Sequence, residues 1–357
     1  MRFIPKSALI LTAAAGLAQA QVPADVAKKL INIGRGVCVP ETAEVYRPMH
    51  PNPPYSGVTI VRNASFGPDP MNVLDVFSAE KGGGNRPVLI YVSGGAGNKQ
   101  QGGPNGDVFY DNVMLWATKN GMVGVNMQRR PGTEWDDPAK DISLIIQWVQ
   151  KNISKYKGNP NRIFMWSQSA GNVPMATYVG HPELYTPTGI GIKGVVFMSP
   201  PAFDILPATP PVQGGGGFGA CGRPDGSPAP APAARGGGGP GGAGKGGPGR
   251  GDGKASNAKG GGGGRGRGAV DPATQLARSN LPGMLKAKIP YMLTVAELDP
   301  PNIIGFAETL RDELKKGGHP ATYMVFKDHS HISEVMSPDT ADTSVTGPIL
   351  KWIKSVK

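Results

Sequence analysis

Residues 162–172, RIFMWSQSAGN, hold a serine in a setting that suits nucleophilic chemistry. An apolar run leads into SQSAG at 167–171, and a segment compatible with a helix follows. A serine on a tight strand-to-helix turn has its hydroxyl raised above the sheet, and small residues two positions before and after it permit the close backbone approach. The pattern predicts Ser169 as a nucleophile. The alternative is an ordinary helix start with Ser167 as its N-cap.

A serine nucleophile needs a base that takes its proton and a carboxylate that orients the base. The acid is expected in AELDP at 296–300, directly after an apolar run. Asp299 is preferred, because Glu297 sits closer to the end of the run and Pro300 marks a turn that presents Asp299 outward. Glu297 remains the alternative.

The base is expected in KDHSH at 327–331, which follows the next apolar run. Only one of its two imidazoles can meet Ser169, and His331 is preferred over His329. The other histidines, at 50, 181 and 319, have no metal-ligand spacing with carboxylates or cysteines, so no metal and no cofactor are predicted.

Acyl transfer also needs N–H donors for the oxyanion. These are expected from the backbone of Ala170 and from the glycine-rich loop VSGGAG at 92–97, because glycines let a backbone approach a ligand closely. The loop taken alone also resembles a phosphate cradle. It lacks the Lys-Ser/Thr ending of a P-loop and the spacing of a dinucleotide fingerprint, which disfavours both.

The residues singled out above follow apolar, β-branched runs that predict strands. Eight such runs occur, at 58–62, 72–77, 88–92, 122–127, 162–166, 194–198, 290–295 and 322–326. Helical patterns alternate with them from the third run onward, at 108–119, from Asp136-Asp137-Pro138 to about 157, and at 170–179, 303–316 and 345–356. The alternation predicts a mostly parallel eight-stranded sheet flanked by helices, with the first two strands as an antiparallel edge.

Composition is uneven along the 357 residues. Residues 214–268 hold 26 of the 54 glycines, together with eight Lys/Arg and two Asp, so much of the net charge of +11 is local. We expect 207–270 to be a disordered Gly/Pro/Ala/Arg insertion in a single catalytic domain formed by 21–206 and 271–357. The RGRG at 265–268 permits polyanion binding, but a solvated linker is favoured and no nucleic-acid partner is predicted.

The first twenty residues are typical of an export signal. Arg2 and Lys6 precede a short apolar run at 8–18, and AQA at 18–20 offers small residues for cleavage before Gln21. No later stretch reaches the roughly 18 apolar residues that a membrane span needs. The mature protein is therefore expected to be secreted or periplasmic. Cys38 and Cys221, the only cysteines, are candidates for a disulfide there.

The chain resembles the carboxylesterase and hormone-sensitive-lipase-like esterases of the α/β-hydrolase fold over roughly 30–206 and 271–356. LDVFSAEKGGGNRPVLIYVSGGAG is similar to the family's strand pair and HGGG loop, YDNVMLWATKNGMVGVNMQRR to its first helix and fourth strand, SQSAG to GxSxG, and HSHISEV to its histidine loop. The resemblance implies a triad and an oxyanion hole. The triad would be Ser169, Asp299 and His331, and the oxyanion donors Gly95, Ala96 and Ala170.

Three positions depart from the family pattern. Ser93 stands in place of the HGGG histidine, Ala96 in place of its third glycine, and Ser167 in place of the first glycine of the elbow. All three lie beside the expected active centre.

The sequence thus predicts a secreted serine hydrolase that cleaves a small-molecule carboxylic ester through an acyl-enzyme. Other acyl hydrolysis, by an amidase, a lactonase or a peptidase-like enzyme, stays open because a triad does not choose the leaving group. A hydrolase-fold protein without catalysis, which binds a surface or a polyanion through the basic insertion, is the alternative from a different class. The sequence does not indicate whether the protein is a monomer or an oligomer.

Overall fold

A computed structural model describes residues 22–100, 108–208 and 271–357. The expected export signal at 1–20 and Cys221 lie outside these residues, as does the insertion from 209 onward. The predicted domain limits therefore stay predictions at both places.

The centre of the molecule is one eight-stranded sheet, with neighbouring strands in the order β1-β2-β4-β3-β5-β6-β7-β8. The strands are β1 Val58–Ser65, β2 Val73–Ala79, β3 Arg86–Val92, β4 Val123–Met127, β5 Gly158–Gln168, β6 Gly194–Met198, β7 Tyr291–Ala296 and β8 Thr322–Phe326. Only the β1–β2 and β2–β4 pairs are antiparallel, and the remaining pairs are parallel. The predicted sheet and its antiparallel edge are confirmed.

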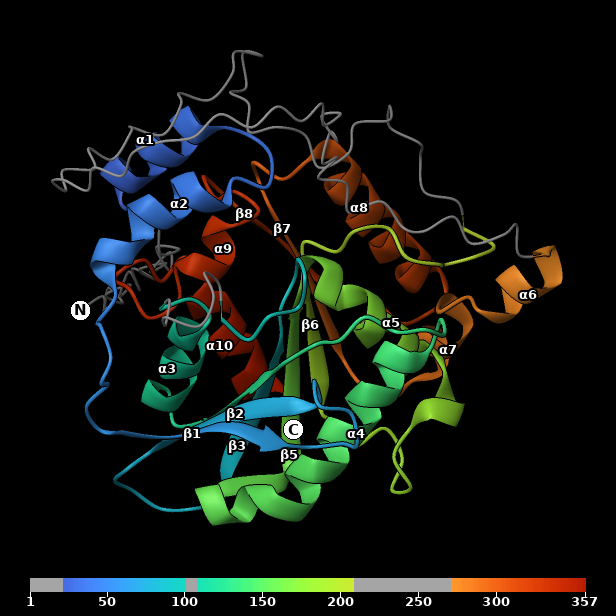
Figure 1. Ribbon diagram of the computed structural model, residues 1–357. Coiled ribbons are helices and arrows are strands. Elements are labelled where there is room, and N and C mark those ends of the chain that lie inside the picture. The colour runs from blue at the N-terminus through green and yellow to red at the C-terminus, as the bar shows by residue number, and fades with distance from the viewer. Residues whose placement is uncertain (1–21, 101–107, 209–270) are drawn as a thin grey trace, which may run out of the picture.

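Helices cover both faces of the sheet (Figure 1). They are α1 Ala24–Ile33, α2 Val39–Tyr46, α3 Asp111–Lys119, α4 Asp137–Asn152, α5 Asn172–Gly180, α6 Pro272–Ala277, α7 Leu281–Lys286, α8 Pro301–Lys316, α9 Ser333–Met336 and α10 Thr346–Ser355, with short 3-10 turns η1 Arg47–Met49, η2 Ile153–Tyr156, η3 Ser169–Gly171 and η4 Pro182–Leu184. One face packs against α4, α5, α7 and α8, and the other against α3, α9 and α10. No described helix is both long and apolar enough to cross a bilayer.

Strand β3 shows how one sequence supplies both cores. Val88, Ile90 and Val92 belong to the cluster under α4 and α5, whereas Leu89 and Tyr91 belong to the cluster under α3 and α10. Successive side chains on a strand point to opposite faces, so a strand covered on both sides is apolar throughout. The continuous apolar runs of the sequence have this physical cause.

The first helices, α1 and α2, are not among the elements that the sequence analysis predicts. Val26, Leu30 and Ile33 face inward from α1 at helical spacing. Together with Tyr46 of α2 they form a third apolar cluster, which reaches Ile332 and the other side chains around the histidine loop. The N-terminal arm therefore covers the loop that carries His331. The amphipathic spacing in residues 24–33 was the available signal.

The predicted start of α4 is correct in position, since the helix begins at Asp137. Asp136 occupies the N-cap position and makes no side-chain cap hydrogen bond. The carboxylate of Asp137 instead accepts N–H hydrogen bonds from Thr133 and Glu134, at 3.2 and 3.0 Å. The loop that precedes the helix folds back onto its first turn, which places the N–H groups of Thr133 and Glu134 within reach of the Asp137 carboxylate.

Helices α5 and α7 cross at two glycines. A Cβ added to Gly283 would lie 1.7 Å from the carbonyl oxygen of Gly180. We expect Gly283→Ala to lower the free energy of unfolding by about 2 kcal/mol or more, because the helices must separate. Gly347→Ala in α10 is the matched control, since a Cβ there meets nothing within 4 Å. It should be neutral or up to about 1 kcal/mol more stable. Equal midpoints in urea for the two variants would contradict this packing.

Candidate active site

Parallel strands place the loops that follow them at one edge of the sheet. The turn after β5 carries Ser169, the loop after β7 carries Asp299, and the loop after β8 carries His331. The loop after β3 carries the expected oxyanion donors at the same edge. Ligands of open α/β sheets bind outside the carboxyl ends of the strands, so this edge is the candidate site.

The turn after β5 has a backbone that few residues tolerate. Ser169 has φ +49° and begins η3, which leads directly into α5. A Cβ added to Gly171 would lie 2.3 Å from the carbonyl oxygen of Val92, so a glycine is required there. The side chain of Ser169 is mostly enclosed, with 8% of the residue exposed. A serine on such a turn has a fixed position at the end of its strand.

Ser167 and Asn172 hold this turn from below. Ser167 is part of β5, and its hydroxyl donates to Oδ1 of Asn172 at 2.7 Å. The Nδ2 amide of Asn172 donates to the carbonyls of Ser169 and Met198, each at 2.8 Å. The alternative interpretation of Ser167 as a helix N-cap is wrong, because its hydroxyl bonds a side chain inside the turn. Asn172 was not singled out as functional from the sequence.

Asp299 and His331 form a buried pair. Nδ1 of His331 lies 2.7 Å from Oδ1 of Asp299, and both residues are fully buried. The second oxygen of Asp299 accepts from the hydroxyl of Ser199 at 2.5 Å and from the backbone N–H of Ala296 at 2.7 Å. A buried carboxylate with three donors can stay ionised and orient an imidazole.

The second ring nitrogen of His331 is left available. Nε2 is buried and has no hydrogen-bond partner among the described residues, and no hydrogen bond joins it to Ser169. The amide of Gln168, the residue before Ser169, donates to the carbonyl of His331 at 3.1 Å, so the turn and the histidine loop are in direct contact. Catalytic hydrogen bonds are often longer without substrate.

The alternatives within the two loops occupy different places. Glu297 is exposed, and its carboxylate accepts the backbone N–H of Asp328 at 2.8 Å, next to the strand end. Both Glu297 and Asp299 offer their carbonyls to the guanidinium of Arg35, each at 2.9 Å. Asp299, and not Glu297, is therefore the carboxylate that meets an imidazole.

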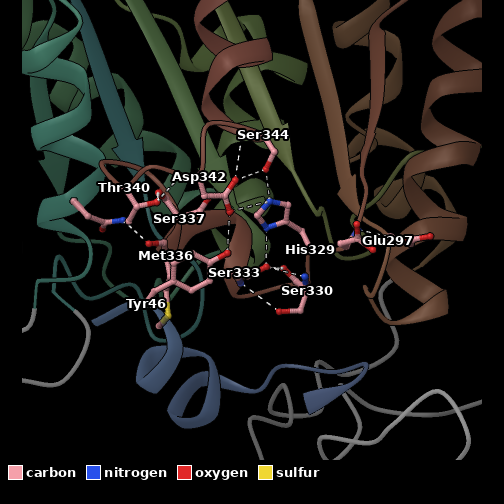
Figure 2. A network of polar contacts seen from close by, with 12 residues as sticks. Tyr46, Glu297, His329, Ser330, Ser333, Met336, Ser337, Thr340, Asp342 and Ser344 are labelled. Atoms are coloured by element: carbon pink, nitrogen blue, oxygen red, sulfur yellow. Dashed lines mark hydrogen bonds and ion pairs between the residues drawn. The ribbon is translucent and has the colours of Figure 1, made fainter. Parts of the chain in front are cut away.

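His329 lies in a separate buried network (Figure 2). Its Nδ1 meets the hydroxyl of Ser333 at 2.8 Å, and its Nε2 meets the hydroxyl of Ser344 at 2.7 Å. Asp342 accepts from Ser344 at 2.5 Å and from the phenol of Tyr46 in α2 at 3.0 Å. The network ties the histidine loop to α2, to α9 and to the segment before α10, so His329 supports the loop on which His331 stands.

The loop after β3 is held although it lacks the family's histidine. The hydroxyl of Ser93 donates to the carbonyl of Asn98 at 2.8 Å, and the N–H of Gly97 to the carbonyl of Gly94 at 2.9 Å. A Cβ added to Gly94 would lie 2.8 Å from Cβ of Ser169, so the loop passes beside the turn. Gly95 and Ala96, the two loop residues expected as oxyanion donors, follow Gly94 and are exposed. Ala170, the third expected donor, is half-buried.

Glu334 is a buried acid of the site that the sequence analysis did not single out. Both of its carboxyl oxygens are buried, with the side chains of Ser199 and Gln168 as their polar neighbours. Burial, followed by the negative charge of Asp299, raises the pKa of Glu334 well above its usual value. Its place three residues after His331, one helical turn away, was the available signal.

Glu334 also completes a set of three potential metal ligands. One atom each of Asp299, His331 and Glu334 lie within 4.8 Å of one another, all buried. Nδ1 of His331 and Oδ1 of Asp299 already bond each other, which leaves only Nε2 of His331 and the carboxyl of Glu334 as donors for an ion. The residues present therefore fit an acid–base pair better than a metal centre.

Cys38 is buried at the N-cap of α2 and is not a free thiol. Cys221 lies outside the described residues. The predicted pairing of the two stays a prediction.

Sequence comparisons match about a third of the chain. The family model described as BD-FAE matches residues 74–181, which include the loop after β3 and the turn with Ser169. A probable isoprenylcysteine alpha-carbonyl methylesterase of Arabidopsis thaliana is 31% identical over 113 residues, 31% of this chain and 22% of that protein. Human cocaine esterase is 32% identical over 116 residues, 28% of this chain and 19% of that protein. The chain thus matches about a fifth of the length of each relative.

Structural comparisons extend over most of the chain. Esterase B from Lactobacillus rhamnosis has a TM-score of 0.54 at 13% identity, covering 87% of this chain and 89% of that one. A thermostable esterase from Pseudomonas putida has a TM-score of 0.52 at 14% identity, covering 84% of each chain. At these identities the likeness shows a shared fold.

The network around His329 predicts a dependence of stability on pH. Burial lowers the pKa of His329 from 6.5 to about 4, a shift that nearby Asp342 only partly offsets. Between these values the unfolded chain binds a proton that the folded chain does not. The contribution of His329 to the free energy of unfolding is therefore complete above pH 6.5. It falls by about 1.4 kcal/mol per pH unit as the pH drops to 4, by at most about 3 kcal/mol in total.

The measurement is urea unfolding at several pH values from 7 to 4, beside His329→Gln. The glutamine variant is expected to be less stable at pH 7, because it loses part of the network. Its free energy of unfolding should then fall less steeply with pH than that of the unchanged chain. Parallel curves for the two proteins would show that His329 does not titrate in this range.

Proposed function

We propose that this chain, which has the α/β-hydrolase fold of the esterases compared above and matches the BD-FAE family model over residues 74–181, hydrolyses carboxylic esters through an acyl-enzyme on Ser169. The observation that carries the proposal is the buried Asp299–His331 pair, 2.7 Å apart, at the sheet edge where the strained turn presents Ser169. A nucleophile on a strained turn and an oriented imidazole are the parts that acyl transfer requires. The similar proteins named above are themselves esterases by name.

In the proposed reaction, Nε2 of His331 takes the proton of Ser169 as Oγ attacks the ester carbonyl carbon. The tetrahedral intermediate collapses, and the same proton passes from Nε2 to the departing alkoxide, which leaves as the alcohol. Water then gives a proton to Nε2 and attacks the acyl-enzyme, and the proton returns to Oγ as the acid is released. Asp299 stays ionised throughout, and stabilises the imidazolium through Nδ1.

The oxyanion is proposed to be stabilised by backbone N–H groups of Gly95, Ala96 and Ala170. Support comes from the close passage of the loop at Gly94, where an added Cβ would lie 2.8 Å from Cβ of Ser169, and from the hydrogen bonds that fix the loop through Ser93 and Gly97. A donor set fixed before the reaction lowers the barrier because it needs no reorganisation as charge develops. The serine at position 93 thus takes over a role in holding this loop.

Replacing the nucleophile tests the mechanism directly. We expect Ser169→Ala to hydrolyse p-nitrophenyl butyrate at least about 10⁴-fold more slowly than the unchanged chain, since no acyl-enzyme can form. The substitution keeps a small residue in the turn. A p-nitrophenyl alkylphosphonate should add one phosphonyl group to the unchanged protein, and none to Ser169→Ala, by intact-protein mass spectrometry.

The matched control is Ser154→Ala, which removes an exposed hydroxyl from η2. It should keep both turnover and phosphonate labelling. Turnover that persists in Ser169→Ala would exclude Ser169 as the nucleophile. Absence of turnover in the unchanged chain, with labelling retained, would direct attention to amide or lactone substrates of the same triad.

We also propose that the protein acts outside the cytoplasm after cleavage behind Ala20. The support is the sequence of residues 1–20, with its two basic residues, apolar run and small residues at the cleavage positions. Mass spectrometry of the protein purified from the culture medium or periplasm of an expressing bacterium should give an N-terminus at Gln21. Recovery of the full-length chain from the cytoplasm alone would contradict the proposal.

A further inference from the structure

Arg129 carries a positive charge at the candidate site that no carboxylate of the described residues neutralises. It lies two residues beyond the end of β4, close to the loop after β3. The neighbouring Arg130, by contrast, pairs with Asp141 at 2.7 Å and with Asp69 at 3.8 Å. Two consecutive arginines thus differ in that only one has an acidic partner within the described part of the chain.

The side chain of Arg129 lies along the loop that carries the proposed oxyanion donors. A Cβ added to Gly97 would lie 2.6 Å from Cβ and 3.0 Å from Nε of Arg129, and Nη2 of Arg129 donates to the carbonyl of Gly95. Gly94, the preceding residue, is the one that approaches Ser169. The guanidinium is therefore attached to the same short loop that borders the nucleophile.

The guanidinium is only partly committed to this loop. Its Nε–H is buried without a partner, and Nη2 donates one hydrogen bond, to an uncharged carbonyl. Burial lowers the pKa of Arg129 from its usual value, although the group stays charged at neutral pH. A half-buried cation without a counter-charge is unfavourable, and a ligand that supplies an anion would relieve it. The planar guanidinium fork fits a carboxylate with two parallel hydrogen bonds.

We propose that Arg129 recognises a carboxylate on the substrate, so that the preferred esters carry a free carboxylate group. The inference rests on the proposed ester hydrolysis at Ser169, and it adds the class of substrate. The carboxylate belongs either to the acyl part, as in a monoester of a dicarboxylic acid, or to the alcohol part. If Arg129 only held the loop, its hydrogen bond to the carbonyl of Gly95 would be enough, and the buried Nε–H would need no ligand.

The test compares esters that differ by one charge. p-Nitrophenyl hydrogen succinate and p-nitrophenyl butyrate have acyl chains of equal length, and 4-carboxyphenyl butyrate places the carboxylate on the alcohol side. In Arg129→Met, the ratio of kcat/KM for one of the anionic esters to that for p-nitrophenyl butyrate should fall about 10- to 100-fold, mainly through KM. Arg129→Lys keeps the charge without the fork, and should fall in between.

The matched control is Lys155→Met, which removes one exposed positive charge from η2, before the start of β5. It should leave the ratio unchanged, which excludes an effect of net charge. Equal loss on all three esters in Arg129→Met would overturn the inference and leave Arg129 as a residue that only holds the loop. Which anionic ester is affected identifies the side of the ester that carries the carboxylate.

A binding measurement separates this inference from the proposed function. Monomethyl succinate and 4-carboxyphenyl butyrate, which carry the carboxylate on the acyl and the alcohol side, can each be titrated calorimetrically into Ser169→Ala, with and without Arg129→Met, so that no turnover is required. We expect at least tenfold weaker binding of one of these esters when Arg129 is replaced. Equal or absent binding of both esters in both proteins would overturn carboxylate recognition even if ester hydrolysis is established, whereas a difference would support it even if the esters tested are not cleaved.

Discussion

The close approach of the turn after β5 to the backbone of β3 is the constraint on which the site depends. The space between them admits no side chain at Gly171, and the turn forces Ser169 to φ +49°. Such a conformation persists only where its surroundings determine it. Asn172 provides this by bonding the carbonyl of Ser169 and the hydroxyl of Ser167 together. The position of the hydroxyl thus follows from the packing of strands that form the centre of the sheet.

A second requirement is the burial of an ionised carboxylate beside an imidazole. Asp299 meets it with donors from Ser199, Ala296 and His331. The region is also covered from outside by α1 and α2, whose apolar side chains reach the histidine loop. Tyr46, at the end of α2, bonds Asp342 in the His329 network (Figure 2). The N-terminal arm thereby helps to exclude water from the acid–base pair, and a drier surrounding strengthens the electrostatic interaction between them.

The unpaired polar groups of the described residues are informative where they gather around this edge. Burial and the negative charge of Asp299 favour the neutral form of Glu334, which limits the negative charge that competes with Asp299 for the imidazolium. Arg129 stays charged at the rim of the loop after β3. Glu334 lies fully buried beside Asp299, whereas Arg129 is half-buried against the loop after β3, so the positive charge is the more accessible of the two to an anionic substrate.

The sequence alone predicted the sheet with its antiparallel edge, since strands covered on both faces must be apolar throughout and helices must alternate with parallel strands. It also singled out the loops of Ser169, Asp299 and His331, because chain order and turn chemistry are local properties. It predicted neither α1 and α2 nor the roles of Ser199, Asn172 and Glu334. These side chains act through contacts between segments far apart in the chain, and only the tertiary structure brings such segments together. The uncompensated charge of Arg129 is likewise a tertiary fact, because whether an arginine has an acidic partner depends on which carboxylates folding places beside it.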